Sequence, residues 1–245
     1  MTGRAAERRP ASIAERLRAV DWRDVAAALR ESAYARLPAR LSAEECASLL
    51  ALYEDDGRFR TRVDMERHRF GVGEYKYFSY PLPLLVVDLR REAYPPLAAI
   101  ANRWMEALGE RQRFPPDLQA FLTRCVRAGQ TRPTPLLLRY EAGGYNALHQ
   151  DTYGEVSFPL QLVVFLSQPD VDYTGGEFLL VEQRPRAQSV GEAIVAEKGQ
   201  MLVFTNRIRP AAGARGAYRV NVRHGVSRVR SGRRFALGVI FHDAA

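Results

Sequence analysis

FPLQLVVFLS, at residues 158–167, is one of six short apolar runs that follow Pro133. The other five are PLLLRY (135–140), GEFLLVE (176–182), QMLVFT (200–205), YRVNVRHGVS (218–227) and RFALGVIFH (234–242). Short runs that are rich in β-branched and aromatic residues, and that glycine, proline or aspartate separates, are typical of β-strands. Strands at this spacing favour a sandwich or a barrel. We therefore predict a β-sandwich core of the jelly-roll kind, a double-stranded β-helix.

The residues before this core have a helical pattern. Ile13, Leu17 and Val20 fall on one helical stripe, and Asp21 is placed to cap a second short helix. Further expected features are a capping box made by Ser42 and Glu45, strands between Phe59 and Tyr80, and helices near Pro96–Leu108 and Pro116–Ala128. The predicted fold class is α+β. Residues 1–133 form a helical and mixed support region, packed on one face of a jelly-roll core at residues 134–245, and both parts share one hydrophobic core.

Composition narrows the class of protein. Hydrophobic residues make up 47% of the 245 residues and charged residues 26%, which is ordinary for a globular protein. No apolar run reaches the roughly 18–20 residues of a membrane helix, and the basic N-terminus lacks the apolar stretch of a secretory signal. We therefore expect a cytoplasmic protein without a membrane partner. Cys46 and Cys125 lie far apart in apolar helical patterns, which predicts two buried thiols.

Three side chains could form a metal site. His149 and Asp151 are two residues apart, and such residues point to the same face of a strand. His224 lies in another strand-like run, YRVNVRHGVS. Two imidazoles and one carboxylate are the ligand set of non-haem Fe(II) oxygenases, which leaves coordination positions open for a co-substrate and dioxygen. A His-x-Asp pair alone is more often a surface pair, and we assign no metal role to His68 or His242.

A basic residue after His224 strengthens this interpretation. A turn at Arg230–Gly232 would return Arg234 on a strand beside His224, where a guanidinium can bind a carboxylate through two hydrogen bonds. Tyr140 could donate a hydrogen bond to the same carboxylate, although a tyrosine here is also a common core residue. Arg233 directly precedes Arg234, strand alternation would send the two side chains to opposite faces, and a one-residue bulge would exchange their positions.

The motifs around these residues resemble the 2-oxoglutarate/Fe(II) dioxygenase superfamily. RYEAGGYNALHQD (139–151) resembles the segment that opens the catalytic domain of prolyl 4-hydroxylase-like oxygenases. TGGEF (174–178) resembles the Gly-Gly-Glu strand that follows it, and HGVSRVRSGRRFALG (224–238) resembles the segment of the distal histidine. A narrower resemblance, to a bacterial family proposed to demethylate damaged nucleobases oxidatively, includes FGVGEYKYFSYPLP (70–83) and GGEFLLVEQRPRAQS (175–189).

The resemblance implies both cofactors and residue roles. His149, Asp151 and His224 would be the catalytic Fe(II) ligands. Arg234, and with less support Tyr140, would bind the co-substrate 2-oxoglutarate. Arg234 is preferred to Arg233 because its position ten residues after His224 matches the spacing of the resemblance. Dioxygen would be the second co-substrate, and the reaction would be hydroxylation of a C–H bond, which removes the group when the carbon is an N-methyl group.

The charge of the chain bears on its substrate. The formal net charge is +8 and the pI is about 9.8, which favours a polyanionic partner such as alkylated, single-stranded or base-flipped DNA. Ten basic and no acidic residues lie between Lys198 and His242, so we expect positive charge around the site entrance. Candidate substrate contacts are Tyr145, Tyr153, Arg184 and Arg186. A solvated arginine-rich face would explain the same charge.

Two other functions stay open on the sequence. The first is a prolyl 4-hydroxylase-like hydroxylase of a protein side chain or an amino acid, which the general motif match favours. The second is a module that binds nucleic acid without catalysis, although all three ligand positions are filled.

Overall fold

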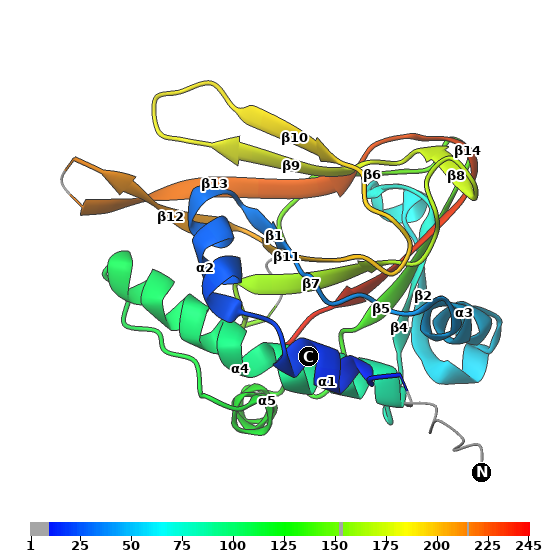
Figure 1. Cartoon of the computed structure of the whole chain (residues 1–245), viewed down its shortest axis with the longest axis horizontal. Coiled ribbons are helices and arrows are strands. Elements are labelled where there is room, and N and C mark those ends of the chain that lie inside the picture. The colour runs from blue at the N-terminus through cyan, green and yellow to red at the C-terminus, as the bar shows by residue number, and fades with distance from the viewer. Residues whose placement is uncertain (1–9, 152–153, 215) are drawn as a thin grey trace, which may run out of the picture.

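Two antiparallel β-sheets stack on each other, and helices cover the outer face of the larger sheet (Figure 1). The structure is a computed structural model and describes residues 10–151, 154–214 and 216–245. The larger sheet has the order β1–β11–β7–β14–β5–β4–β2, with β8 paired to β14, and the smaller has β10–β9–β13–β6–β3, with β12 paired to β13. The larger sheet contains β1 (Tyr34–Arg36), β2 (Phe59–Asp64), β4 (Glu74–Phe78), β5 (Leu136–Glu141), β7 (Leu160–Phe165), β8 (Tyr173–Gly175), β11 (Met201–Thr205) and β14 (Val229–Val239). The smaller sheet contains β3 (Gly71–Val72), β6 (Tyr145–His149), β9 (Phe178–Gln183), β10 (Val190–Ile194), β12 (Ile208–Gly213) and β13 (Gly216–Val226).

The α-helices are α1 (Ile13–Arg18), α2 (Trp22–Glu31), α3 (Ala43–Ala51), α4 (Leu84–Ala107) and α5 (Leu118–Arg127), and three short 3-10 helices are η1 (Leu52–Glu54), η2 (Asp56–Arg58) and η3 (Glu66–His68). The chain is therefore a mixed helix and antiparallel-sheet fold. Each of the six apolar runs contains a strand, and the segment from Phe59 to Tyr80 contains three. None of the helices in the described part of the chain has both the length and the apolar character that crossing a bilayer requires.

Side-chain alternation along the central strands separates two cores. On β7, Leu162 and Val164 pack in a cluster with residues of the helices, whereas Val163 and Phe165 pack in a cluster with residues of the smaller sheet. The same alternation places Leu237 of β14 toward the helices and Ala236 between the sheets. Because successive side chains of a strand point to opposite faces, every second residue of β7 and β14 is available to the space between the two sheets.

The helices begin where the capping signals predict. Asp21 accepts a hydrogen bond from the backbone N–H of Arg23 at the start of α2. Ser42 and Glu45 form the predicted capping box of α3. These predictions are confirmed, because a side-chain oxygen satisfies an N–H that the first turn of a helix leaves free.

One predicted helix has the wrong start. The expected helix near Pro96–Leu108 is the C-terminal part of α4, which already begins at Leu84 and contains Pro95 and Pro96 inside it. A proline inside a helix costs about 3 kcal/mol because it removes a backbone hydrogen bond and crowds the preceding turn. Here Val86 and Leu89 are buried before the prolines and Leu97 after them, so burial of one continuous apolar face outweighs that cost.

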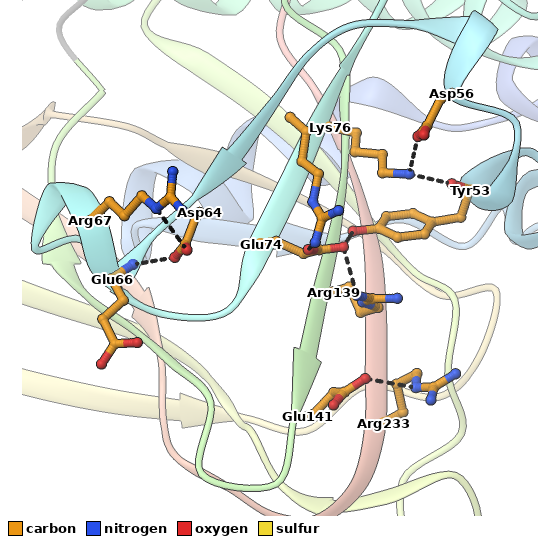
Figure 2. Close-up of polar contacts among 11 residues, drawn as sticks. Tyr53, Asp56, Asp64, Glu66, Arg67, Glu74, Lys76, Arg139, Glu141 and Arg233 are labelled. Carbon is orange, nitrogen blue, oxygen red and sulfur yellow. Dashed lines mark hydrogen bonds and ion pairs between the residues drawn. The ribbon is translucent and has the colours of Figure 1, made fainter.

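A polar network supports the edge of the larger sheet from its outer face. Figure 2 shows Tyr53 and Arg139 converging on Glu74: the Tyr53 hydroxyl donates to Glu74 over 2.5 Å, and Arg139 lies 2.8 Å from the same carboxylate. Because Glu74 points to this face of β4, its neighbours Tyr75 and Tyr77 point to the opposite face, which lines a cavity between the sheets.

Candidate metal and co-substrate site

The structure brings the three predicted ligands together. His149 ends β6, Asp151 follows two residues later, and His224 on β13 is the direct register partner of His149. The Nε2 atoms of His149 and His224 lie 3.3 Å from the two carboxylate oxygens of Asp151, one on each. One ligand atom from each residue lies within 4.8 Å of the others. A single ion could therefore contact all three side chains.

Hydrogen bonds hold two of these ligands in place. Nδ1 of His149 lies 2.7 Å from the carbonyl oxygen of Ala147, so this nitrogen carries the proton and Nε2 keeps its lone pair. Gln161, buried on β7, donates its amide to Asp151 Oδ2 over 2.9 Å. Such bonds orient metal ligands and fix the imidazole tautomer.

The electrostatics of the group suit a cation. Burial would raise the pKa of Asp151, but the two imidazoles hold it well below its usual range. Burial lowers the pKa of His224 and outweighs the attraction of Asp151. For His149, burial acts in the same direction, but the hydrogen bond and charge of Asp151 raise its pKa overall. An ionised carboxylate between two imidazoles is a donor set that fits Fe(II).

Arg234 supplies positive charge to the same space. Its side chain is 1% exposed and lines a cavity of about 400 Å³ that also contains the three ligand residues. No carboxylate of a described residue forms an ion pair with it, and its guanidinium carbon lies 5.5 to 6.0 Å from the ring centroids of Tyr140, Phe165 and Tyr173. A buried cation without an opposite charge beside it is costly, so the floor of this cavity is suited to an anion.

The Gly-Gly-Glu motif makes room for this arginine. Gly176 has a φ of +64°, and a Cβ atom there would lie 2.9 Å from Cδ of Arg234. Any other residue would push against the arginine stem and would also be strained in the left-handed region. The TGGEF segment thus has a physical reason for a glycine at its third position.

Strand alternation distinguishes the two adjacent arginines. Arg234 is paired with Tyr140 across β14 and β5 and points into the cavity. Arg233 is paired with Glu141, is exposed, and forms an ion pair with Glu141 over 3.4 Å (Figure 2). No register shift separates the two, so the bulge that would exchange them is not present at these residues.

The predicted turn at Arg230–Gly232 is wrong. β13 ends at Val226 and β14 begins at Val229, and β14 pairs with β5, β7 and β8 rather than with β13. The chain therefore crosses from the smaller to the larger sheet between these strands. Arg234 reaches the cavity from the sheet opposite His224, not from a strand beside it.

Tyr140 meets the same cavity. It is fully buried on β5, its hydroxyl donates no hydrogen bond to a described residue, and burial raises its pKa to about 12. A neutral phenol at this depth is a hydrogen-bond donor without an acceptor, which suits a bound carboxylate. The positions of Arg234 and Tyr140 fit the far carboxylate of 2-oxoglutarate.

The three predicted substrate residues that the structure describes, Tyr145, Arg184 and Arg186, do not line this cavity. Arg228 covers the ring of Tyr145 at 4.8 Å, and Arg184 and Arg186 lie in the exposed connection between β9 and β10. Tyr153 is outside the described residues. These four contacts stay predictions about a ligand that would extend beyond the cavity.

The described arginines of the basic stretch near the C-terminus point in several directions rather than only toward the site. Arg223 is exposed, whereas His224 beside it is buried, so these neighbours point to opposite faces of β13. Arg209 is buried and bound to Glu182, and Arg219 is paired with Glu110. Of this stretch, Arg234 is the basic residue that lines the cavity among those the structure describes.

Some cavity residues were not predicted from the sequence. They are Gln161 on β7, Tyr75 and Tyr77 on β4, and Arg69 and Phe70 before β3. One signal for Gln161 was available, because it is a polar residue in the middle of the apolar run FPLQLVVFLS, and a polar side chain inside a buried strand needs a partner.

A comparison with protein families shows which family the chain belongs to. The model of the Oxygenase-NA family, described as "Oxygenase, catalysing oxidative methylation of damaged DNA", matches residues 73–244. The chain belongs to the Oxygenase-NA family. It is therefore an oxygenase, and the resemblance inferred from the motifs is confirmed.

Relatives of this Oxygenase-NA member include an uncharacterised protein of Mycobacterium tuberculosis strain H37Rv. It is 52% identical over 168 residues, which is 69% of this chain and 72% of the relative. A protein of strain CDC 1551 of the same organism matches to the same extent.

Solved structures share the fold of the Oxygenase-NA chain. A prolyl-4-hydroxylase of Pseudomonas putida has a TM-score of 0.54 at 14% identity, covering 91% of this chain and 100% of that one. An oxidoreductase of the 2OG-Fe(II) oxygenase family from Burkholderia pseudomallei has a TM-score of 0.53 at 19% identity, covering 91% and 93%. At such identities the likeness is one of fold.

Proposed function

We propose that this oxygenase uses Fe(II), 2-oxoglutarate and dioxygen to remove methyl groups oxidatively from alkylated nucleobases in DNA. The observation that carries the chemistry is one cavity that holds two imidazoles, a carboxylate and, on the opposite sheet, a buried arginine without an ion pair. The two-sheet core is, in this proposal, the double-stranded β-helix of 2-oxoglutarate oxygenases.

The protein side chains divide the work between metal and co-substrate. His149, Asp151 and His224 hold Fe(II), with Gln161 fixing one oxygen of the carboxylate. When bound, Fe(II) activates dioxygen while 2-oxoglutarate is converted to succinate and carbon dioxide, which supplies the oxidising power to hydroxylate a substrate C–H bond.

Arg234 and Tyr140 bind the far carboxylate of the co-substrate. The guanidinium provides two N–H donors and a full charge, and the Tyr140 hydroxyl provides a further donor. The apolar walls, including Leu138, Val163 and Ile240, exclude water from the reacting groups. Exclusion of water strengthens the attraction between the arginine and the carboxylate.

The family description supports nucleobases as substrates. An oxygenase does not donate methyl groups, so we interpret the oxidative reaction on methylated DNA as demethylation. A hydroxylated N-methyl group is unstable and releases formaldehyde, which leaves the base restored. Hydroxylation of a protein side chain is the alternative, and the likeness to prolyl hydroxylases does not favour it, because it is a likeness of fold alone.

Product analysis tests this proposal. The Fe(II)-loaded protein is incubated with 2-oxoglutarate and a single-stranded oligodeoxynucleotide that contains one N-methylated adenine or cytosine. We expect one succinate and one formaldehyde for each methyl group lost, and no such products with proline-rich peptides or unmethylated DNA. Coupled turnover with peptides and none with methylated oligonucleotides would overturn the substrate assignment and leave the oxygenase chemistry standing.

A further inference from the structure

The exposed residues of the cavity lining gather at one place. Arg69 and Phe70 follow η3, Leu148 lies on β6, and Phe70 and Leu148 are 44% and 42% exposed. Among the described lining residues, Asp151 alone is a carboxylate, and Arg69 and Arg234 are the cations. Arg234 is buried at the floor and Arg69 is exposed, so the cavity has one arginine at each end.

The segment that carries Arg69 and Phe70 is a preformed turn, which we call the Met65–Phe70 turn. The backbone N–H groups of His68 and Phe70 donate to the carbonyl of Met65 over 3.2 and 3.0 Å, and Met65 itself is fully buried. Figure 2 shows Asp64 at its base, which accepts from the N–H of Glu66 and pairs with Arg67. The turn is therefore ordered by its own hydrogen bonds.

Two aromatic rings stack on this turn beside a free cation. The rings of His68 and Phe70 lie 5.4 Å apart at an interplanar angle of 21°. Arg69 lies between these two residues in the sequence. Its φ of 60° is costly for a residue with a side chain, and it forms no ion pair with any described residue. A flat ring surface and a guanidinium are the groups that bind a base and its phosphate in single-stranded nucleic acid.

Hydrogen bonds connect this turn to the candidate metal site. The carbonyl of Phe70 accepts from the N–H of Ala147 over 2.8 Å, and the carbonyl of Ala147 accepts from Nδ1 of His149 over 2.7 Å. The backbone of the turn at Phe70 is thus held at a fixed position relative to a predicted iron ligand. A ligand contacting both would be positioned by one rigid unit.

We propose that the Met65–Phe70 turn binds the nucleotide next to the target base, with Phe70 stacking on its base and Arg69 contacting its phosphate. This inference rests on the proposed function, because it takes methylated DNA as the substrate. An acidic peptide could form an ion pair with Arg69, but its acidic side chains have no flat ring to stack on the pair of His68 and Phe70. The geometry therefore favours nucleic acid.

The test uses a fluorescent neighbour base. The probe is a short single-stranded oligodeoxynucleotide with one N-methylated adenine and 2-aminopurine beside it, added to the full chain loaded with Mn(II) and 2-oxoglutarate. We expect the wild-type protein to quench the 2-aminopurine signal through stacking. Phe70→Ala should lose this quenching and bind roughly five- to hundredfold more weakly, and it should still fold because Phe70 is exposed.

Salt dependence tests the phosphate contact. Arg69→Gln should reduce the slope of log affinity against log salt concentration by about 0.7, which corresponds to one lost contact with single-stranded nucleic acid. Arg67→Gln is the matched control, because it removes the same charge from the same turn at a side chain that does not line the cavity and is already paired with Asp64. It should keep the wild-type slope and quenching.

The outcomes separate the two proposals. If the wild-type protein demethylates the probe while Phe70→Ala and Arg69→Gln match it in quenching, affinity and salt slope, the assignment of the turn is wrong and the proposed function stands. If the wild-type protein neither binds nor demethylates methylated oligonucleotides and instead hydroxylates peptides, both proposals are wrong.

Discussion

Arg209 and Arg234 are buried to nearly the same degree, 2% and 1% exposed, yet their surroundings differ in kind. Arg209, on β12, binds both carboxylate oxygens of Glu182 over 2.5 and 2.8 Å and also donates to the carbonyl of Arg30. Arg90 on α4 is similar, with Asp243 at 3.1 Å. Arg234 has aromatic rings around it and no ion pair with a described residue.

The difference shows which buried charges the protein compensates with its own side chains and which one it leaves to a ligand. A buried charge is tolerated when an opposite charge and hydrogen bonds compensate it. The fold compensates Arg209 and Arg90 with its own carboxylates. Arg209 joins α2 to the smaller sheet, and Arg90 joins α4 to the segment that follows β14. The charge of Arg234 is left to a ligand. Arg234 departs from the rule that a buried charge has an opposite charge beside it, and this departure marks the candidate functional site.

Breaking the pair at Arg209 should have the largest effect. Arg209→Met leaves Glu182 charged and largely buried, so we expect the free energy of unfolding to fall by about 3–5 kcal/mol, as measured by urea denaturation. The affinity of the folded protein for 2-oxoglutarate should not change. The double variant Arg209→Met, Glu182→Leu should recover at least half of the loss, and a loss as large as that of the single variant would contradict the role of the pair.

Arg234→Met should reverse this pattern. The affinity of the metal-loaded protein for 2-oxoglutarate, measured by calorimetry, should fall by roughly 2–5 kcal/mol, which is about 30-fold or more. The free energy of unfolding without ligand should stay the same or rise, because an uncompensated charge is removed. Arg233→Met is the matched control, since its exposed ion pair with Glu141 contributes little. Equal losses of affinity in both variants would refute the assignment.

His242 shows a third way to bury a basic group, which is to keep it neutral. It is fully buried, the N–H of Phe158 donates to its Nδ1, and burial lowers its pKa to about 4. Its pKa in the unfolded chain is near 6.5, so between these values the unfolded state binds more protons. Stability should therefore fall with acidification, by about 2 kcal/mol between pH 7 and pH 5.

The comparison with His242→Gln isolates this contribution. The glutamine oxygen can still accept from the N–H of Phe158, but it does not titrate. Urea denaturation at the two pH values should show a smaller acid-induced loss of stability in the variant, by about 2 kcal/mol. Identical losses in both proteins would mean that His242 is not held neutral by the fold.

Local rules predicted the parts of the molecule that depend on neighbours in sequence. The capping box of Ser42 and Glu45 needs only a spacing of three residues, and the structure has it. Alternation separates Arg233 from Arg234 once the strand is regular, and Arg234 is the one on the cavity face. His149 and His224 could be nominated from motifs, although their convergence depends on the pairing of β6 with β13.

Pairing between distant strands was not predictable in the same way. The prediction of a turn at Arg230–Gly232 was wrong because β14 belongs to the sheet opposite β13. The local sequence of β14 does not indicate which sheet the strand joins. α4 continues through Pro95 and Pro96 because tertiary burial outweighs the local signal. Gln161 became a candidate only when β7 was placed opposite Asp151.

Two buried tyrosines repeat the contrast of the arginines on a smaller scale. The Tyr53 hydroxyl donates to Glu74, whereas the Tyr140 hydroxyl donates no hydrogen bond to a described residue. Tyr140→Phe should weaken 2-oxoglutarate binding by about 0.5–1.5 kcal/mol, which is roughly two- to tenfold, and leave the stability of the ligand-free protein unchanged. Tyr53→Phe should do the opposite, because it removes a partner of a buried carboxylate while the cavity stays intact. Calorimetry and urea denaturation of both variants check this, and a loss of stability in Tyr140→Phe equal to that in Tyr53→Phe would show that the Tyr140 hydroxyl serves the fold rather than a ligand.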